Sequence, residues 1–157
     1  MKTILFVCTG NLCRSPMAEA LMRQRLVAAG LDTLVTVHSA GVYAMTGRAA
    51  SAGAVEVISE RGGDLTDHVA RDLTLDAVAQ AGIVLVMEEA HRRSIFNLAP
   101  QHIHKVFLLT EMAGKHYDVE DPYGQPLDEY RRCADEINRL IDAGFDNILR
   151  RLRLPRQ

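Results

Sequence analysis

The sequence predicts an α/β fold, a single three-layer domain in which helices cover both faces of a central four-stranded parallel sheet. Short β-branched and apolar segments alternate along the chain with longer segments of helical character, which is typical of a parallel sheet with right-handed crossovers. The length of 157 residues is that of one domain, and no repeat, low-complexity segment or linker divides it. We therefore expect one domain over residues 1–157.

The predicted strands are four apolar segments that are too short to be helices. They lie at residues 3–7, 34–41, 83–87 and 105–109. The predicted helices lie at residues 16–30, 51–63, 73–82, 88–98 and 127 to about 152. A polar loop over residues 110–125 precedes the last of them. In sheets of this kind ligands bind at the carboxyl ends of the strands, so we expect the functional site there.

The composition is that of a soluble globular protein, with 48% hydrophobic and 24% charged residues. No apolar run approaches the ~20 residues that cross a bilayer, and the N-terminal segment lacks the features of a secretory signal. Three cysteines predict reduced thiols rather than a disulfide scaffold, and hence a cytoplasmic protein. The net charge of −2 predicts no nucleic-acid partner, and we expect no membrane partner. A C-terminal basic cluster is interpreted as a solvated helix end: Arg150, Arg151, Arg153 and Arg156.

The connection between the first strand and the first helix has the sequence FVCTGNLCRSPMAEA. Such a loop directs backbone N–H groups into one concavity, where the helix dipole adds positive charge, so it predicts an anion site. Gly10 lets the backbone approach a ligand, Asn11 suits a left-handed conformation, and Arg14 offers a planar fork for two phosphate oxygens. The same field favours a thiolate, which makes Cys8 a candidate nucleophile. Ser15 either donates its hydroxyl to this sulfur or caps the helix.

Expulsion of the leaving group from a phosphate monoester requires a proton donor. Asp121 is the candidate, because it lies in the polar loop after the last strand, at the same end of the sheet as Cys8. The alternative is an Asp-Pro turn without a chemical role. Weaker candidates in the same region are Asp118, Glu120 and Asp128.

The motif VCTGNLCRSPMAEA resembles the signature of the low molecular weight protein tyrosine phosphatases. The resemblance continues through SAG at residues 39–41, HVAR at 68–71 and DPYG at 121–124. It implies a phosphatase that needs no metal or cofactor and that forms a cysteinyl-phosphate on Cys8. Asp121 would then be the general acid and afterwards the general base. The implied partner is a phosphorylated protein, and we expect a monomer or weak dimer.

The resemblance also implies supporting roles for residues around the loop. The implied phosphate- and substrate-binding residues are Thr9, Gly10, Asn11, Leu12, Cys13, Ser15, Tyr43 and Tyr123. The network that would hold the loop in shape comprises Asn11, Ser39 and His68. From the residues alone, His68 would be a surface histidine beside a helix. Cys13 is either a packing residue or the partner of Cys8 in a protective, redox-sensitive disulfide.

The choice of substrate lies between phosphotyrosine and phosphoarginine. Residues 105–140 resemble the protein arginine phosphatase branch, which carries threonine where this chain has Leu12. Because Leu12 would pack against a phenyl ring and offers nothing polar to a phosphoguanidinium, we predict phosphotyrosine and keep phosphoarginine as the alternative. An arsenate reductase needs two further cysteines, and none lies between Cys13 and Cys133. A non-catalytic anion-binding module would not require Asp121.

Two features outside the loop carry weaker signals. His102 and His104 alternate in a segment that we expect at a strand edge, where alternate residues share a face. Without a third ligand nearby they are interpreted as strand-edge histidines rather than metal ligands. Glu88 follows Met87 at a position where tyrosine phosphatases of the resembling family often have an aspartate.

Overall fold

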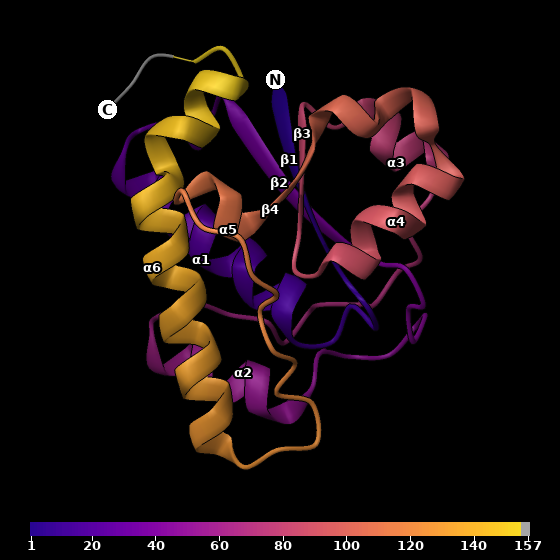
Figure 1. The fold of residues 1–157 in the computed structure, drawn as a ribbon. Coiled ribbons are helices and arrows are strands. Elements are labelled where there is room, and N and C mark those ends of the chain that lie inside the picture. The colour runs from indigo at the N-terminus through magenta and orange to yellow at the C-terminus, as the bar shows by residue number, and fades with distance from the viewer. Residues whose placement is uncertain (155–157) are drawn as a thin grey trace.

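The computed structural model describes residues 1–154 and contains the predicted parallel sheet (Figure 1). Its strands are β1 (Lys2–Cys8), β2 (Val35–Gly41), β3 (Ile83–Val86) and β4 (Val106–Leu108). All pairings are parallel, and the strand order is β2-β1-β3-β4. The order places β1 and β3 at the centre, so the residues that follow these two strands lie next to each other at the carboxyl edge.

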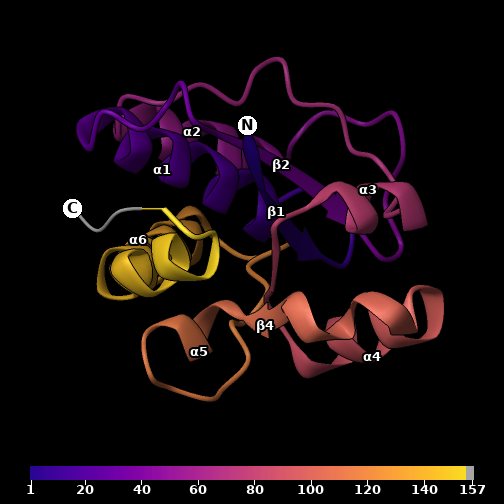
Figure 2. The same cartoon turned by 90° about the horizontal axis from the view of Figure 1, so that it is seen from above.

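The helices lie on both faces of the sheet, as predicted (Figure 2). They are α1 (Arg14–Ala28), α2 (Ala52–Glu60), α3 (Leu75–Gln80), α4 (Glu89–Leu98), α5 (Leu109–Met112) and α6 (Leu127–Arg151). Figure 2 shows α1, α2 and α6 on one side of the sheet and α3 and α4 on the other. The prediction of a three-layer α/β fold is therefore confirmed.

The central strand β1 contributes to two hydrophobic cores. Ile4 and Phe6 belong to the larger core, together with residues of α1, α2 and α6. Leu5 and Val7 belong to the smaller core under α3 and α4. Since successive side chains of a strand point to opposite faces, burial on both faces requires an unbroken apolar run. This explains why β1 has no polar alternation before it reaches Cys8.

The prediction of a polar loop over residues 110–125 is wrong for residues 110–112, which belong to a helix. The short helix α5 follows β4 directly, and Leu109 and Met112 are buried in the larger core. This helix packs closely on α6. The approach is so close that a Cβ added to Gly144 of α6 would lie 2.7 Å from Met112 Cβ. The first helix also begins at Arg14 rather than Pro16, while Gly30, with φ of 71°, lies beyond its end.

The interpretation of His102 and His104 as strand-edge residues was wrong. Both lie in a 3-10 helix over Pro100–Lys105, and β4 begins only after it. Pro100 stands at the first position of this helix, where its fixed φ is suitable and its missing N–H is not needed. Within residues 1–154 no group of three or more His, Cys, Asp or Glu side chains is placed to hold a metal ion.

The C-terminal basic cluster lies mainly at the end of α6. Arg150 donates a hydrogen bond to Asn147 Oδ1, and the Arg151 guanidinium lies 4.2 Å from the centre of the Phe107 ring. Arg156 lies outside the described residues. In the part of the chain that the structure describes, no helix combines the length and the apolar character needed to cross a bilayer.

Candidate active site

The loop between β1 and α1 is shaped by the buried side chain of Asn11. Its φ of 59° is left-handed, which confirms the expected conformation. The Asn11 amide donates to Ser15 Oγ at 2.9 Å and to Ser39 Oγ at 3.0 Å. Its Oδ1 accepts the backbone N–H of Arg71 at 3.0 Å. Asn11 therefore ties the loop to α1, to β2 and to the segment before α3.

Further contacts support the loop from the outside. Ser39 Oγ donates to Glu19 Oε1 at 2.6 Å, and His68 Nε2 lies 2.8 Å from the carbonyl oxygen of Asn11. The structure thus brings both Ser39 and His68 to the loop, and His68 is not merely a surface histidine. At Gly41, the last residue of β2, an added Cβ would lie 2.5 Å from the Thr9 carbonyl oxygen, so this close approach requires glycine.

Cys8 is buried at the end of β1, and its Sγ lies 2.9 Å from Ser15 Oγ. Because the Asn11 amide nitrogen can only donate, Ser15 Oγ accepts there and keeps its own proton for the sulfur. The Cys8 sulfur therefore accepts a hydrogen bond from the Ser15 hydroxyl. Within residues 1–154, Cys13 is the N-cap of α1 and no side chain caps this helix. Of the two roles considered for Ser15, the contact with Cys8 is therefore the one observed.

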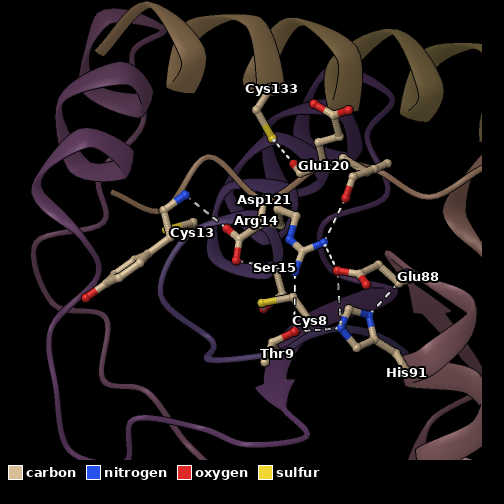
Figure 3. Close-up of polar contacts among 12 residues, drawn as sticks. Cys8, Thr9, Cys13, Arg14, Ser15, Glu88, His91, Glu120, Asp121 and Cys133 are labelled. Atoms are coloured by element: carbon tan, nitrogen blue, oxygen red, sulfur yellow. Dashed lines mark hydrogen bonds and ion pairs between the residues drawn. The ribbon is translucent and has the colours of Figure 1, made fainter. Parts of the chain in front are cut away.

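Arg14 is the first residue of α1, and its side chain is only 1% exposed. Its Nη1 donates to Glu88 Oε2 at 2.5 Å and to the Val119 carbonyl oxygen at 2.7 Å (Figure 3). Its Nη2 donates to Thr9 Oγ1 at 3.4 Å and lies 3.6 Å from Asp121 Oδ2. The guanidinium is thus held by residues that follow β1 and β3 and by the loop that precedes α6.

The Nε of Arg14 is a buried donor without a hydrogen-bond partner among residues 1–154. Burial alone would lower the pKa of Arg14, but the negative charges of Cys8, Glu88 and Asp121 outweigh it and raise the pKa above its usual range. A permanently charged guanidinium whose Nε–H is unpaired within the described residues is suited to an oxyanion. The residues present therefore fit a phosphoryl group beside Cys8.

Asp121 lies in the loop between α5 and α6, and its side chain is 42% exposed. Its Oδ1 accepts the backbone N–H of Tyr123 at 3.1 Å, which orients the carboxylate. It lines the same cleft as Cys8. The position fits a proton donor that can reach the leaving group.

The other acidic candidates are engaged elsewhere. Asp118 Oδ1 accepts the backbone N–H of Glu89 at 3.0 Å, at the start of α4. Glu120 is exposed and lies 3.6 Å from Arg132. Asp128 is exposed in an ion pair with Arg131. The structure brings none of these three into the lining of the cleft, in contrast to Asp121.

The cleft over Cys8 has a volume of about 210 Å³. Its lining includes Leu12, Tyr43, Met45 and Tyr123, so its surface is mainly apolar. Tyr43 is 79% exposed and Tyr123 50% exposed, which leaves both rings available to a ligand. Met45 was not predicted from the sequence as a cleft residue, because it lies in a glycine-containing segment without a recognisable motif. A larger cavity of about 490 Å³ lies at the opposite end of the sheet, but no cysteine of residues 1–154 lines it.

His91, on the first turn of α4, is a second residue near the site that was not predicted from the sequence. It is buried, its Nδ1 accepts the backbone N–H of Glu88 at 3.1 Å, and its Nε2 lies 2.9 Å from Thr9 Oγ1. Burial and the positive charge of Arg14 lower the pKa of His91 to about 4, so the ring is neutral at neutral pH. The available signal was the spacing of Glu88 and His91 at a helix start, which is that of a capping box.

Cys13 is buried beside the cleft rather than open to solvent. Its Sγ lies 3.1 Å from Ser51 Oγ and 3.6 Å from the Tyr130 hydroxyl. Burial raises the pKa of Cys13 in spite of these two hydrogen bonds, so Cys13 is a protonated thiol at neutral pH. Cys133 in α6 is also buried, and burial raises its pKa to about 12. All three cysteines are free thiols.

Comparison with known proteins agrees with this geometry. The family model described as low molecular weight phosphotyrosine protein phosphatase matches residues 3–153. A probable low molecular weight protein-tyrosine-phosphatase, EpsP, of Ralstonia nicotianae is 41% identical over 94% of this chain and 97% of its own length. A protein-arginine-phosphatase of Bacillus subtilis is 42% identical over 88% of this chain and 91% of its own length.

Among solved structures, a low molecular weight protein tyrosine phosphatase from T. tengcongensis superimposes with a TM-score of 0.88. It is 42% identical and covers 94% of this chain and 99% of its own. Fold and site together define a hydrolase of phosphoric monoesters. The chain belongs to the low molecular weight phosphotyrosine protein phosphatase family.

Proposed function

We propose that this chain is a metal-independent protein tyrosine phosphatase that acts through a cysteinyl-phosphate on Cys8. The observation that carries the proposal is that Arg14 and Cys8 lie at the two ends of one short connection. The buried Arg14 guanidinium has an Nε without a partner among residues 1–154, and the Cys8 sulfur receives a hydrogen bond from Ser15. These groups supply a phosphate-binding cation and an activated nucleophile at one place.

The reaction proceeds in two steps. In the first, Cys8 Sγ attacks phosphorus, the bond to the leaving oxygen breaks, and Asp121 gives its proton to that oxygen. In the second, Asp121 takes a proton from water, whose oxygen attacks the phosphorus of the phosphocysteine; the S–P bond breaks, its electron pair returns to Cys8 Sγ, and inorganic phosphate is released. Arg14 and the loop amides hold the equatorial oxygens in both steps. The proposal assigns Ser15, Asn11, Ser39 and His68 to keeping this loop in shape.

The enzymatic function is tested with p-nitrophenyl phosphate in the presence of a chelator. We expect release of p-nitrophenol without added metal and its inhibition by vanadate, an oxyanion that the same loop would hold. Binding of vanadate without any turnover would instead identify an anion-binding module.

Replacement of Asp121 with asparagine tests its role as the acid. The amide cannot donate a proton to the leaving oxygen, so hydrolysis of alkyl or unsubstituted phenyl phosphates should slow about a hundredfold or more. The rate of the first step with p-nitrophenyl phosphate should fall much less, because its leaving group departs with little protonation. The measurement is the pre-steady-state rate of leaving-group release on both substrates, and an equal loss on both would assign Asp121 to binding.

The preference for phosphotyrosine is proposed from the walls of the cleft. The loop and Arg14 contact only the phosphoryl group, so selection must come from the residues beside the leaving group. Leu12, Met45 and the two tyrosines present apolar surface to a phenyl ring. A guanidinium there would lose hydration without gaining an acceptor from Leu12. Relatives named for either activity are about equally similar to the chain, so the identities alone do not select the substrate.

Leu12→Thr should shift this preference. We expect the natural protein to hydrolyse phosphotyrosine peptides with about ten- to a hundredfold higher kcat/KM than phosphoarginine peptides, and the variant to narrow the ratio. Both constants are measured side by side on peptides of the same flanking sequence. A natural preference for phosphoarginine would show that residues 105–140 were the better guide than Leu12.

We also propose that Cys13 protects Cys8 from irreversible oxidation. Peroxide would convert Cys8 to a sulfenic acid, and Cys13 Sγ would displace water from it to form a disulfide. The proposal is supported by the presence of both cysteines in the lining of one cleft. Activity after peroxide should return with a thiol reductant in the natural protein, and far less in Cys13→Ser. Equal recovery in both would remove this role.

The cellular setting is likewise a proposal. The reduced cysteines support a cytoplasmic enzyme, and the net charge of −2 supports a protein substrate rather than a nucleic acid. We propose a monomer or weak dimer. Light scattering over a range of concentrations tests the oligomeric state, and fractionation of the source cells tests the location.

A further inference from the structure

The first turn of α4 holds the ring of His91 by both of its nitrogens. Nδ1 accepts the backbone N–H of Glu88 and therefore carries no proton. In the neutral ring the proton then lies on Nε2, which donates to Thr9 Oγ1 at 2.9 Å. The hydrogen-bond network thus selects one tautomer and gives the ring one donor, directed at the phosphate loop (Figure 3).

Thr9 connects this donor to Arg14. Thr9 Oγ1 accepts from His91 Nε2 and from Arg14 Nη2, which uses both lone pairs of the hydroxyl oxygen. Its own proton remains to be donated, and Thr9 lines the cleft over Cys8. On the other side of the guanidinium, Nη1 donates to Glu88. The start of α4 therefore contacts Arg14 on both terminal nitrogens, directly through Glu88 and indirectly through His91 and Thr9.

We propose that His91 is a positioning residue for phosphoryl transfer, whose neutral Nε2–H holds the Thr9 hydroxyl in place and thereby orients the Arg14 guanidinium for a phosphoryl oxygen. This inference rests on the function proposed above. A histidine suits the task because an uncharged donor does not repel the guanidinium, whereas a lysine at this buried position would place a second cation beside it. The charged groups that act electrostatically on the ring are Arg14, Glu88, Asp118 and Asp121, and of these Glu88 Oε2 lies 3.9 Å from Nε2.

The test uses variants that separate the two hydrogen bonds of the ring from its bulk. His91→Leu removes both bonds, whereas His91→Gln keeps an amide that can accept from Glu88 N–H and donate to Thr9. Thr9→Val removes the hydroxyl with little change of shape, and Thr9→Ser retains it. His104→Leu, an exposed histidine in the 3-10 helix before β4, is the matched control. Each variant is assayed for kcat/KM on p-nitrophenyl phosphate and for calorimetric affinity toward inorganic phosphate.

We expect His91→Leu to lower kcat/KM by about ten- to a hundredfold and to weaken phosphate binding, since small misplacements of a binding group have effects of this size. His91→Gln and Thr9→Ser should restore most of the loss, and His104→Leu should match the natural protein. In the double variant with Thr9→Val, His91→Leu should cause little further loss, because both changes interrupt one chain of contacts. Unchanged thermal unfolding in His91→Gln separates positioning from folding.

Additive losses in the double variant would overturn the proposal, as would a loss in His91→Gln equal to that in His91→Leu. If His91→Leu does not fold, His91→Phe, which keeps a ring of similar bulk and lacks both nitrogens, replaces it in the same comparison. If the natural protein binds phosphate without turnover, the proposed function is refuted. The role of His91 is still tested in that case, because its variants are also compared by their affinity for phosphate. Nitrogen NMR of the ring at neutral pH should show the proton on Nε2, and a proton on Nδ1 would contradict the inferred tautomer.

Discussion

Cys8→Ser should lower kcat/KM for p-nitrophenyl phosphate by at least about a thousandfold while phosphate binding is retained. A serine hydroxyl must lose a proton before it attacks, and the group next to Cys8 Sγ is Ser15 Oγ, which donates a proton and does not remove one. The rest of the loop, including Arg14 and Asn11, is unchanged by the substitution. The variant should therefore bind substrate and fail to turn it over.

Cys133→Ser is the control for Cys8→Ser. It makes the same chemical change at another buried cysteine, in α6, which lies outside the lining of the cleft. Its kcat/KM should stay within about threefold of the natural value, as expected for a residue that touches no reacting atom. Near-natural turnover in Cys8→Ser, or an equal loss in both variants, would refute covalent catalysis by Cys8.

Arg14→Lys should lower kcat/KM by at least about a hundredfold, because a point charge cannot replace a planar fork. The guanidinium satisfies Glu88 and the Val119 carbonyl with Nη1 and contacts Thr9 with Nη2, and it still has Nε for a ligand. A lysine ammonium has three donors at a single atom and cannot span these positions. Steady-state kinetics and phosphate calorimetry measure the loss.

Arg132→Lys is the control for Arg14→Lys. Arg132 lies on α6, pairs with Glu129 at 2.5 Å, and is about half exposed. Exposed pairs of this kind contribute little, so kcat/KM and phosphate affinity should stay within about twofold of the natural protein. If Arg14→Lys retained the natural phosphate affinity, Arg14 would not be the phosphate-binding group.

The part of the site that the sequence predicts best is the part that is contiguous in it. Cys8, Asn11, Arg14 and Ser15 lie between one strand and one helix, so their types and spacing already indicate an anion site with a nucleophile. The left-handed conformation of Asn11 follows from its short polar side chain and is observed. Asp121 is distant in the sequence, and its prediction depended on the strand order and on the resemblance.

The remaining contacts depend on tertiary structure. Glu88 and Val119 reach Arg14 because β3 lies beside β1 and because the loop before α6 returns to Met87, whose carbonyl oxygen accepts the N–H of Val119. His91 reaches Thr9 only because α4 starts directly after β3. The local pattern around these residues is that of an ordinary helix start. Likewise, α5 forms where Met112 packs on α6, which no local pattern predicts.

The most direct test of the account is to trap the phosphoenzyme on Asp121→Asn with p-nitrophenyl phosphate. This substrate phosphorylates the enzyme with little help from an acid, whereas hydrolysis of the intermediate lacks its base, so the intermediate should accumulate. Acid quenching within one turnover and peptide mass spectrometry locate the phosphoryl group. The account predicts one phosphoryl group on Cys8, formed as fast as the first p-nitrophenol is released. Turnover without a phosphorylated peptide, or with the group on Ser15 or Cys13, would contradict it.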